Sequence, residues 1–275
     1  MLTKIATLGP QGTFSEIATR QYLTDKNISA EVVFYPTLKK SLTAIGDEVS
    51  QGMIPVENFS EGFVNLVLDH LLDANLYICG ELSLPIQFSL VGNCQSIEEI
   101  DTLYVQFVAK GQCSEFLDKI NDANIILTES NTQSLAELEQ QQHSAAIVPS
   151  HLLLDQNFRL KVNNVTDYQN NQTRFVYLAK QADDSYNQLS QDYKTSIIVL
   201  YHKDHPGYLE SVLHEFTMRS INLTSIVSRP TRHTFGKYHF FIDLEGHQQE
   251  QNIKEALDAI KATFKVKVLG SYLKC

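Results

Sequence analysis

Two short segments have the residue pattern of a helix start that could bind an anion. Gly12-Thr13 precedes Glu16, and Ser130-Asn131 precedes Gln133, so in each a hydroxyl stands three residues before a carboxyl or amide side chain. At a helix start, unpaired backbone N–H groups and the helix dipole favour negative charge. We expect Asn58 to precede a third such start. In a chain of net charge -10, these local positive ends would help to hold a carboxylate ligand; the alternative is that both hydroxyls only cap their helices.

A third polar segment, NNQTRF at residues 170–175, contains a hydroxyl, an amide and a guanidinium in three consecutive positions. Arg174 could bind a carboxylate through two parallel hydrogen bonds. The alternative is a turn that enters a strand over residues 175–178, with Arg174 in a structural ion pair. The residues alone leave both readings of this arginine open.

Composition favours a globular, cytoplasmic chain with room for one large domain or two ordinary ones. Of the 275 residues, 43% are hydrophobic and 20% are charged, and the net charge of -10 argues against a nucleic-acid surface. No apolar run approaches membrane-spanning length, and the N-terminal one is too short for a signal peptide. The four cysteines form no CxxC, and the nine histidines form no HExxH. We therefore expect no metal, although His202 and His205 flank a turn.

The first two thirds of the chain alternate strand and helix patterns. Buried-strand patterns cover residues 4–8, 32–35, 53–56 and 145–148. Helices are predicted from Thr13, over the apolar stripe of residues 38–49, over residues 61–72 and from Ser130. Such alternation is typical of open α/β sheets, whose ligands lie beyond the carboxyl ends of the strands.

The last third has a separate pattern. Residues 181–194 are polar and without apolar periodicity, which is typical of a linker. Strands are then predicted at 196–201, 222–228, 238–244 and 266–272, with one helix over 209–216 and another over 253–264. The order βαββαβ in about 80 residues is the ferredoxin-like arrangement.

Five segments, in order along the chain, resemble one enzyme family. LGPQGTFSE at 8–16, GMIPVEN at 52–58 and NQTRF at 171–175 are similar to the motifs of prephenate dehydratases. HPGYLESVL at 205–213 and INLTSIVSRP at 221–230 resemble the regulatory ACT domain of those enzymes. The resemblance implies a two-lobed α/β catalytic domain like type II periplasmic binding proteins, followed by a ferredoxin-like domain. The implied domains are 1–180, with one lobe of about 1–78 plus 160–180 and another of about 79–159, and 195–275.

By this resemblance, the protein converts prephenate to phenylpyruvate, water and carbon dioxide in phenylalanine biosynthesis. No cofactor is needed, because aromatisation of the ring drives the step and the protein must only bind two carboxylates and assist the leaving hydroxyl. Phenylalanine would bind the ACT domain as a feedback inhibitor. A homodimer or homotetramer is usual for the family, and neither nucleic acid nor a membrane is an expected partner.

The resemblance also assigns residues to the two sites. Thr173 would be the donor to the leaving hydroxyl. The substrate-binding residues would be Gly12, Thr13, Asn58, Ser60, Ser130, Asn131, Gln172, Arg174 and Phe175. The phenylalanine-binding residues would be Gly207, Tyr208, Leu209, Asn222, Leu223, Ser228 and Arg229. Tyr208 is bulkier than the family's usual alanine, and Val227 removes the charge of its usual glutamate.

Four catalytic-domain positions depart from the family pattern. Phe59 and Phe63 stand at two positions that usually carry hydroxyls, Phe88 often corresponds to histidine, and Asn131 stands where threonine is usual. Losing one useful hydrogen bond costs roughly 1–3 kcal/mol, or about 10- to 100-fold in rate.

Three features soften these losses. The Asn131 amide can still donate a hydrogen bond, and Ser60 lies beside Phe59. On the predicted helix, Phe59 and Phe63 are four residues apart and would pack together beside the substrate ring. We therefore expect a working dehydratase with an apolar cleft. The alternatives are a decarboxylase that does not expel the hydroxyl, and a non-catalytic amino-acid sensor.

Overall fold

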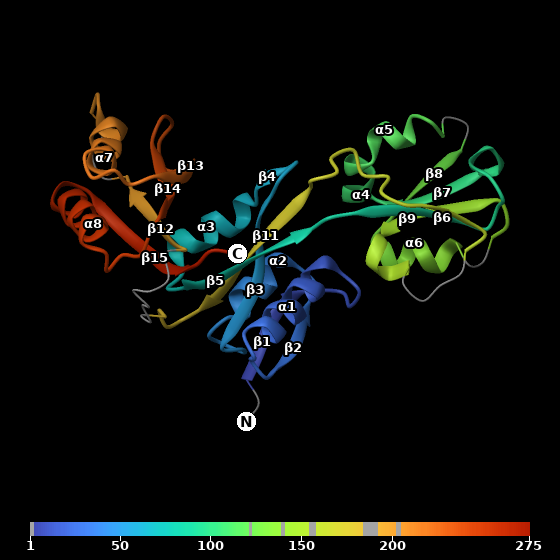
Figure 1. Ribbon diagram of the computed structural model, residues 1–275, viewed down its shortest axis with the longest axis horizontal. Helices are drawn as coiled ribbons and strands as arrows, with labels where there is room; N and C mark the ends of the chain where they lie inside the picture. The colour runs from blue at the N-terminus through green and yellow to red at the C-terminus, as the bar shows by residue number, and fades with distance from the viewer. Residues whose placement is uncertain (1–2, 121–122, 139–140, 154–157, 184–191, 202–204) are drawn as a thin grey trace.

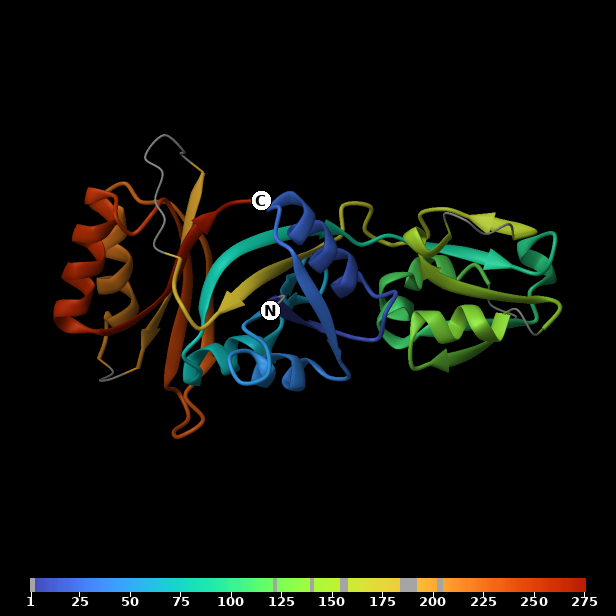
Figure 2. The same cartoon turned by 90° about the horizontal axis from the view of Figure 1, so that it is seen from below.

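The computed structural model describes residues 3–120, 123–138, 141–153, 158–183, 192–201 and 205–275. Three bodies lie in a row in both views (Figures 1 and 2): the C-terminal domain, a first lobe and a second lobe. Each is built around its own sheet. Among the described residues, no helix is both long and apolar enough to cross a bilayer.

Lobe 1 contains a sheet in the order β2-β1-β3-β11-β5, with the two-residue β4 paired to β3. Strands β1 (Thr3–Leu8), β2 (Ala30–Tyr35) and β3 (Gln51–Asn58) are parallel, and β11 (Gln172–Ala179) runs antiparallel between β3 and β5 (Tyr77–Pro85). The strands predicted at 4–8, 32–35 and 53–56 are confirmed as β1, β2 and β3.

Helices cover both faces of this sheet because the parallel strands are apolar on both sides. Helix α1 (Phe14–Asp25) packs on the face that includes Ile5 and Met53. Helices α2 (Leu38–Ala44) and α3 (Asn65–Asp73) pack on the face that includes Ala6 and Ile54. We refer to these as the α1 face and the α3 face.

The helix predicted over residues 61–72 begins later than expected. Gly62–Phe63 form strand β4, which pairs with Asn58 and Glu57 of β3, and α3 starts only at Asn65. Gly62 has a φ of 77°, a left-handed conformation that suits a tight hairpin turn and ends any helix there. The expectation that Asn58 precedes a helix start is therefore wrong.

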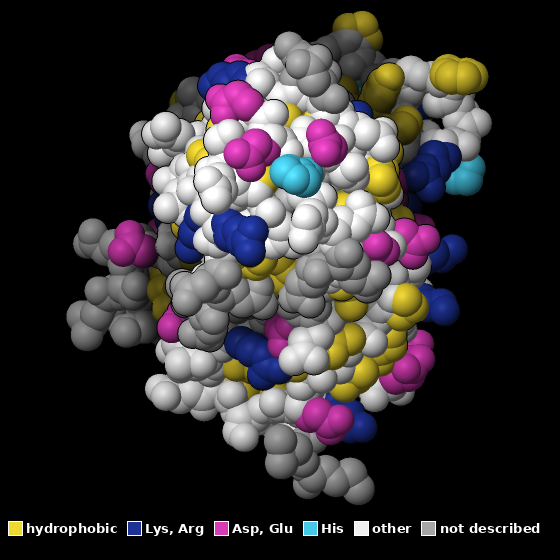
Figure 3. Space-filling model, turned by 90° about the vertical axis from the view of Figure 1, so that its right-hand side faces the viewer, with side chains coloured by type: hydrophobic (Ala, Val, Ile, Leu, Met, Phe, Trp, Pro, Cys, Tyr) yellow, Lys and Arg dark blue, Asp and Glu magenta, His cyan; other side chains and the backbone are white. Residues whose placement is uncertain are grey.

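Lobe 2 contains a sheet in the order β10-β6-β9-β7-β8, with β7, β8 and β9 parallel. The strands are β6 (Phe88–Gly92), β7 (Thr102–Gln106), β8 (Asn124–Thr128), β9 (Ser144–Pro149) and β10 (Leu160–Val162). The helices are α4 (Phe107–Gln112), α5 (Ser114–Leu117), α6 (Asn131–Leu138) and the short 3₁₀ turns η1 (Ile97–Glu99) and η2 (Ser150–Leu153). At the outer end of this lobe, acidic and basic side chains are interspersed (Figure 3).

Sheet membership moves the expected lobe boundaries. Strand β5, from residue 77 to 85, belongs to the sheet of lobe 1, so the chain crosses to lobe 2 after Pro85 and not near residue 79. Strand β10, from residue 160 to 162, belongs to lobe 2, so the return crossing comes later than residue 160. The boundaries near 79 and 160 were wrong because pairing with distant strands, and not a local turn, decides which sheet each strand joins.

The C-terminal domain has the predicted βαββαβ order. Strands β12 (Tyr193–Leu200), β13 (Leu223–Pro230), β14 (Tyr238–Glu245) and β15 (Lys265–Leu273) form an antiparallel sheet in the order β13-β14-β12-β15. Helices α7 (Tyr208–Thr217) and α8 (Gln251–Thr263) cover one face. The sheet begins at Tyr193, so the last two residues of the expected linker are strand; residues 184–191 lie outside the described residues.

The other face of this sheet packs against lobe 1. Ile198, Phe241 and Leu269 join the α3-face core, which also includes Ile78 and Val176. The helices α7 and α8 therefore lie on the outer side, away from lobe 1 (Figure 2). The C-terminal domain and lobe 1 therefore share one apolar core.

Candidate active site

In each lobe, the edge of the sheet where the parallel strands end faces the other lobe. Strands β1 and β3 of lobe 1 end at Leu8 and Asn58, and α1 begins at that edge. In lobe 2, η2 follows β9, and its His151 Nε2 lies 3.4 Å from the Gly12 carbonyl oxygen of lobe 1. A Cβ placed on Gly12 would be 3.1 Å from Thr132 at the start of α6. The helix starts of α1 and α6 thus meet at the crevice between the lobes, where open α/β sheets bind ligands.

Thr173 lies at this edge and is bonded to Asn58. The register pairs Thr173 of β11 with Asn58 of β3, and Asn58 Nδ2 donates a hydrogen bond of 2.9 Å to Thr173 Oγ1. Asn58 Nδ2 is also 3.2 Å from the Gln172 carbonyl oxygen. The Thr173 hydroxyl accepts from the amide, so its own proton is left for another acceptor.

The turn after β3 fixes the orientation of the Asn58 amide. Asn58 Oδ1 accepts hydrogen bonds from the backbone N–H groups of Ser60 at 3.0 Å and Glu61 at 3.1 Å, and from the Ser60 hydroxyl at 2.7 Å. Backbone N–H groups can only donate, so the oxygen must face the turn and the nitrogen must face Thr173. Ser60, predicted as a substrate ligand, is thereby engaged in holding Asn58.

The start of α1 has the predicted cap. Thr13 Oγ1 accepts a hydrogen bond from Glu16 N at 3.4 Å, and Glu16 Oε2 accepts one from Gly12 N at 2.6 Å. The Thr13 cap is confirmed, but the Glu16 carboxylate reaches the N–H of Gly12, one residue before the one that a capping box uses. The Gly12 N–H is therefore already bonded within the chain. Arg20 holds the buried Glu16 carboxylate from the other side, with 2.8 Å between Nε and Oε1.

The start of α6 is also capped as predicted. Ser130 Oγ accepts from Gln133 N at 3.1 Å, and Gln133 Oε1 accepts from Glu129 N at 2.9 Å. Asn131 Oδ1 is buried and has no hydrogen-bond partner in the described part of the chain. An unpaired buried acceptor is costly, so a donor group at this position would be favourable.

Arg174 points away from Thr173, toward the C-terminal domain. Its Nη1 lies 2.7 Å from Asp243 Oδ2 of β14 and 3.5 Å from Glu81 Oε2 of β5. Its Nε lies 3.2 Å from Glu57 Oε2, without the alignment of a hydrogen bond. Of the two readings left open by the residues, the geometry supports the structural ion pair. We call Arg174, Glu57, Glu81, Asp243 and Lys194 the interdomain ion cluster.

Several predicted site residues lie elsewhere. Phe175, expected to touch substrate, is 1% exposed in the core shared by the lobes and α1. It is therefore a packing residue. The Gln172 side chain is exposed, and its carbonyl oxygen accepts from Phe59 N at 2.8 Å. Phe88 is buried and meets Phe14 of α1 edge-on, with 5.6 Å between ring centroids.

The two phenylalanines of the turn do not pack together as predicted. Phe59 is 68% exposed, whereas Phe63 packs against the α3-face core. Phe63 pairs with Glu57 across β3 and β4, and the Arg174 guanidinium lies 5.7 Å from its ring centroid. Phe63 thus lies on the opposite face of the sheet from Thr173. The predicted pair on one helix was wrong because Phe59 lies in a turn and Phe63 lies in strand β4.

The residues predicted to bind phenylalanine are divided within one chain. Gly207, Tyr208 and Leu209 line a pocket of about 240 Å³, where the Tyr208 hydroxyl donates to the Leu200 carbonyl oxygen at 3.2 Å. Asn222, just before β13, donates to Glu245 Oε2 at 3.0 Å.

At the other end of β13, Arg229 is bonded to Asp69 of α3 at 2.9 and 2.8 Å. Leu223 lies beside Asn222, and Ser228 lies beside Arg229. The two ends of the strand are about 20 Å apart, which no single amino acid spans.

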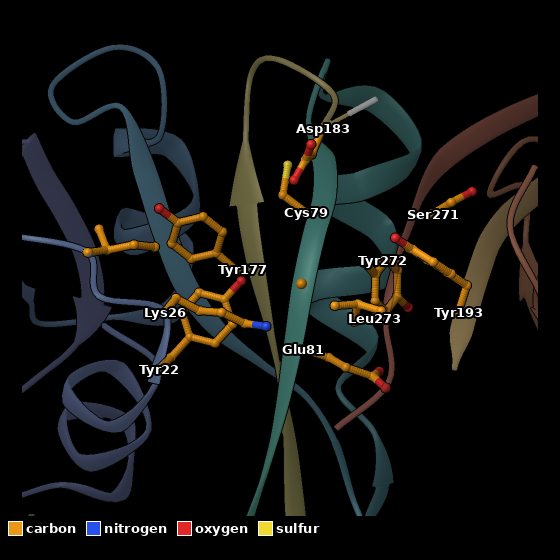
Figure 4. A pocket seen from close by; sticks show the side chains of 12 residues that line it. Tyr22, Lys26, Cys79, Glu81, Tyr177, Asp183, Tyr193, Ser271, Tyr272 and Leu273 are labelled. Atoms are coloured by element: carbon orange, nitrogen blue, oxygen red, sulfur yellow. The ribbon is translucent and has the colours of Figure 1, made fainter. Parts of the chain in front are cut away.

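A separate pocket of about 210 Å³ lies between lobe 1 and the C-terminal domain (Figure 4). Tyr22 of α1 and Tyr177 of β11 stack in its wall with 4.8 Å between ring centroids. Burial, with the nearby Cys79, raises the pKa of Tyr177 to about 12. Glu81 also lines this pocket, but its carboxylate points toward the strands that carry Tyr193 and Tyr272. Lys194 binds it there at 2.7 and 2.9 Å.

The sequence reading missed the interdomain ion cluster and His151. The available signals were charged residues inside apolar strands: Glu81 in ICGELSLP and Asp243 in YHFFIDLE. A buried charge is costly unless it is paired. Each of these two charged residues therefore indicates an oppositely charged partner, but only the fold shows which residue that partner is. Within the described ranges no cluster of three metal-ligand side chains is found, and His202 of the possible metal pair lies outside them.

Comparison with known proteins decides the family. The family model for prephenate dehydratase matches residues 5–183, and the model for the ACT domain matches residues 195–262. The chain belongs to the prephenate dehydratase family.

Full-length relatives agree with this assignment. The bifunctional chorismate mutase/prephenate dehydratase of Aquifex aeolicus (strain VF5) is 33% identical over 274 residues, which cover 98% of this chain and 74% of that protein. The prephenate dehydratase of Bacillus subtilis (strain 168) is 32% identical, with 98% of each chain covered. The structure of the prephenate dehydratase from Arthrobacter aurescens in complex with L-Phe aligns with a TM-score of 0.84 and 27% identity, over 99% of this chain and 90% of that one. The fold is that of a prephenate dehydratase, a lyase, with a C-terminal ACT domain.

Proposed function

We propose that the chain converts prephenate to phenylpyruvate in the crevice between the lobes, with Thr173 as the donor to the leaving hydroxyl. The observation that carries this assignment is the hydrogen bond from Asn58 Nδ2 to Thr173 Oγ1, at 2.9 Å, at the carboxyl edge of the lobe 1 sheet. A hydroxyl that already accepts a hydrogen bond is a better donor with its remaining proton.

The reaction needs little covalent help. The bond to the ring carboxylate breaks, carbon dioxide leaves, and its electron pair enters the ring as the C–O bond of the hydroxyl breaks. One proton is taken up, so that hydroxide leaves as water. The hydrogen bond from Thr173 stabilises the negative charge that develops on the leaving oxygen, and donors placed in this way contribute several kcal/mol at typical sites, about 2.7–4.

The carboxylates of prephenate fit the facing helix starts of α1 and α6. The first turns of α1 and α6 lie where the two lobes meet, and the N–H groups and dipole of a helix start favour anions. The unpartnered Asn131 Oδ1 is an acceptor, which suits a hydroxyl or N–H donor and not a carboxylate oxygen. Arg174 is a poor anchor for the substrate because a carboxylate would have to displace Asp243 from it.

Phenylalanine binding by the ACT domain follows as the second part of the proposal. The Arthrobacter aurescens relative is named as a complex with L-Phe, and this chain has the Gly207 turn with a φ of 85° at the start of α7. Because Gly207 and Asn222 belong to different ends of the domain sheet, one phenylalanine could touch both only if a second copy supplied one of them. A homodimer with phenylalanine at its ACT interface, acting as a feedback inhibitor, satisfies this geometry.

The direct test is product identity. Purified chain is incubated with prephenate at neutral pH, with Thr173→Ala and Thr173→Ser alongside. Phenylpyruvate should form with wild type, the serine variant should retain most of the rate, and the alanine variant should lose about 100-fold or more. A decarboxylated, non-aromatic product would favour the decarboxylase. No turnover with L-phenylalanine still bound, measured by calorimetry, would favour the sensor. Added L-phenylalanine should lower the initial rate.

A further inference from the structure

The interdomain ion cluster and the Thr173–Asn58 pair occupy adjacent positions on the same two strands. The register of β3 and β11 pairs Thr173 with Asn58 and Arg174 with Glu57. Successive side chains of a strand point to opposite faces, so Thr173 and Asn58 share one face while Arg174 and Glu57 share the other. Any movement of Arg174 along or across its strand therefore moves the Thr173 backbone.

The pairing between β3 and β11 is irregular next to this place. Arg174 pairs with Glu57 whereas Phe175 pairs with Pro55, so the extra residue, Val56, forms a bulge in β3 next to Glu57. A bulge disrupts the ladder and re-aims the side chains next to it. Strand β11 itself stays regularly paired with β5 from Gln172 to Tyr177, so the irregularity falls on the β3 side, just before Glu57 and Asn58. The side-chain contact between Glu57 and Arg174 therefore adds to the backbone pairing that holds Asn58 beside Thr173.

The main anchor of Arg174 comes from the ACT domain. Asp243 Oδ2 lies 2.7 Å from Arg174 Nη1, and Asp243 Oδ1 accepts from the Ser196 hydroxyl at 2.5 Å. Ser196 Oγ is also 2.7 Å from the hydroxyl of the fully buried Tyr272. Both oxygens of Asp243 are therefore held, one by its own domain and one by lobe 1.

The other carboxylates hold Arg174 less closely than Asp243 does. Glu81 is already bound by Lys194 at 2.7 and 2.9 Å, and it meets Arg174 only at 3.5 Å. Glu57 lies 3.2 Å from Nε but is not aligned with it. The Arg174 side chain is 14% exposed, so water can replace a lost ion-pair partner of the guanidinium only in part. Without Asp243, the guanidinium would shift toward Glu57 and pull on both strands beside the Thr173–Asn58 pair.

We propose that Asp243 of the ACT domain is a positioning residue for Thr173, acting through the partly buried Arg174 and across the β3–β11 register. The expected effect of Asp243 on kcat rests on the proposed dehydratase reaction. Its expected effect on the position of Thr173 does not. It makes the docked ACT domain part of the framework of the active site.

The kinetic experiment uses the full chain with prephenate. Asp243→Asn keeps the size of the side chain and removes its charge. We expect kcat to fall roughly 10-fold, with KM changed less than about two-fold, because a small displacement of a catalytic group affects the transition state more than binding. The matched control is Lys267→Met. Lys267 of β15 also crosses the interface, donating to the carbonyl oxygens of Leu71 at 2.8 Å and Ala74 at 2.6 Å, but it lies away from Thr173.

A double variant distinguishes positioning from loss of domain docking. If Asp243 acts through Arg174, Asp243→Asn combined with Arg174→Met should be no slower than Arg174→Met alone. Multiplying effects, or an equal fall of kcat in Lys267→Met at a matched loss of melting temperature, would overturn the proposal.

A spectroscopic readout separates this proposal from the dehydratase assignment. In protein labelled with ¹³C at threonine methyl groups, the Thr173 signal is identified by its loss in Thr173→Val. Asp243→Asn should shift that signal and Lys267→Met should leave it in place. An unmoved signal in Asp243→Asn overturns the positioning role, whatever the wild type does with prephenate. A shifted signal without phenylpyruvate formation by the wild type would instead overturn the dehydratase assignment alone.

Discussion

Asn58 donates a hydrogen bond to Thr173 across two strands that are 115 residues apart in the chain, with 2.9 Å between Nδ2 and Oγ1. The direction of this bond is fixed from the far side of the amide, where Asn58 Oδ1 accepts from two backbone N–H groups. The Thr173 hydroxyl is therefore an acceptor toward Asn58 and a donor toward the crevice. The proposed chemistry therefore needs Asn58 as well as Thr173, because the Asn58 amide sets the direction of the Thr173 hydrogen bond.

The first prediction tests that direction. In Asn58→Asp the side chain keeps its shape but loses the Nδ2 donor, so the Thr173 hydroxyl would turn its proton toward the new carboxylate. We expect kcat for phenylpyruvate formation to fall about 100-fold or more, since one preorganised donor is worth about that much. Asn58→Ala, which removes the donor without adding an acceptor, should fall less. Equal losses in the two variants would show that hydrogen-bond direction is unimportant.

The second prediction concerns the two phenylalanines of the turn. Phe59 is 68% exposed, and its backbone N–H donates to the Gln172 carbonyl oxygen. Phe59→Ser should change the free energy of unfolding by no more than about 0.5 kcal/mol. Phe63→Ser should cost about 1–3 kcal/mol, because Phe63 packs on the α3-face core and under the Arg174 guanidinium. Chemical denaturation of both variants is the measurement, and similar losses would contradict the different placements of the two rings.

Local patterns in the sequence predicted local structure well. The caps at Thr13 and Ser130 depend on residues only three positions apart, and both are present. The βαββαβ domain was also predicted, because its strands and helices have clear apolar periods. The start of α3 was missed because the polar turn before it pairs as a hairpin with β3, and backbone pairing leaves no apolar pattern in two residues.

Long-range relations within the site needed the fold. The residues NQTRF were recognised by resemblance, but the sequence could not say that Thr173 and Arg174 face opposite sides of a sheet edge. That division follows from the register with Asn58 and Glu57. Arg174 meets Asp243, 69 residues away in another domain, and no local rule predicts such a partner. The sequence offered an ion pair as one reading of Arg174, and Asp243 is a charge in a buried strand, but nothing in the sequence joined the two.

The third prediction is a pH dependence at the crevice. His151 Nε2 lies against the Gly12 carbonyl oxygen and its ring meets Phe14 edge-on, and burial is the main cause that lowers the pKa of His151 below its ordinary 6.5. A group with a depressed folded pKa takes up protons more readily when unfolded. Its contribution to stability is thus present above pH 6.5 and is lost as the pH falls through that value toward the folded pKa.

Unfolding free energies measured between about pH 5 and about pH 8 would check this dependence. Wild type should lose stability toward acid, and His151→Gln should lose less over the same interval. His70 and His239 also have pKa values lowered mainly by burial, and they remain in both proteins, so their contribution cancels in the comparison. Parallel curves for the two proteins would place the titrating group elsewhere.

The fourth prediction tests how tightly the ACT sheet is docked. At Gly270, where β15 passes β5, an added Cβ would overlap the backbone carbonyl oxygen of Ile78, and the φ of 148° is one that other residues rarely adopt. Gly270→Ala must therefore separate the two strands, at a cost of about 1–3 kcal/mol from overpacking. Gly236→Ala is the control, because Gly236 also has a positive φ, 78°, but nothing lies within 4 Å of its added Cβ.

The control separates backbone strain from steric overlap. Gly236→Ala should lose only about 1 kcal/mol, the cost of the backbone conformation. If the ACT domain positions Thr173 through Asp243, then Gly270→Ala should also lower kcat with prephenate, because separation of the sheets lengthens the 2.7 Å contact between Arg174 and Asp243. Gly236→Ala should keep the wild-type kcat. A Gly270→Ala protein that is less stable but turns over at the wild-type rate would show that β5 and β15 can move apart without disturbing the catalytic pair.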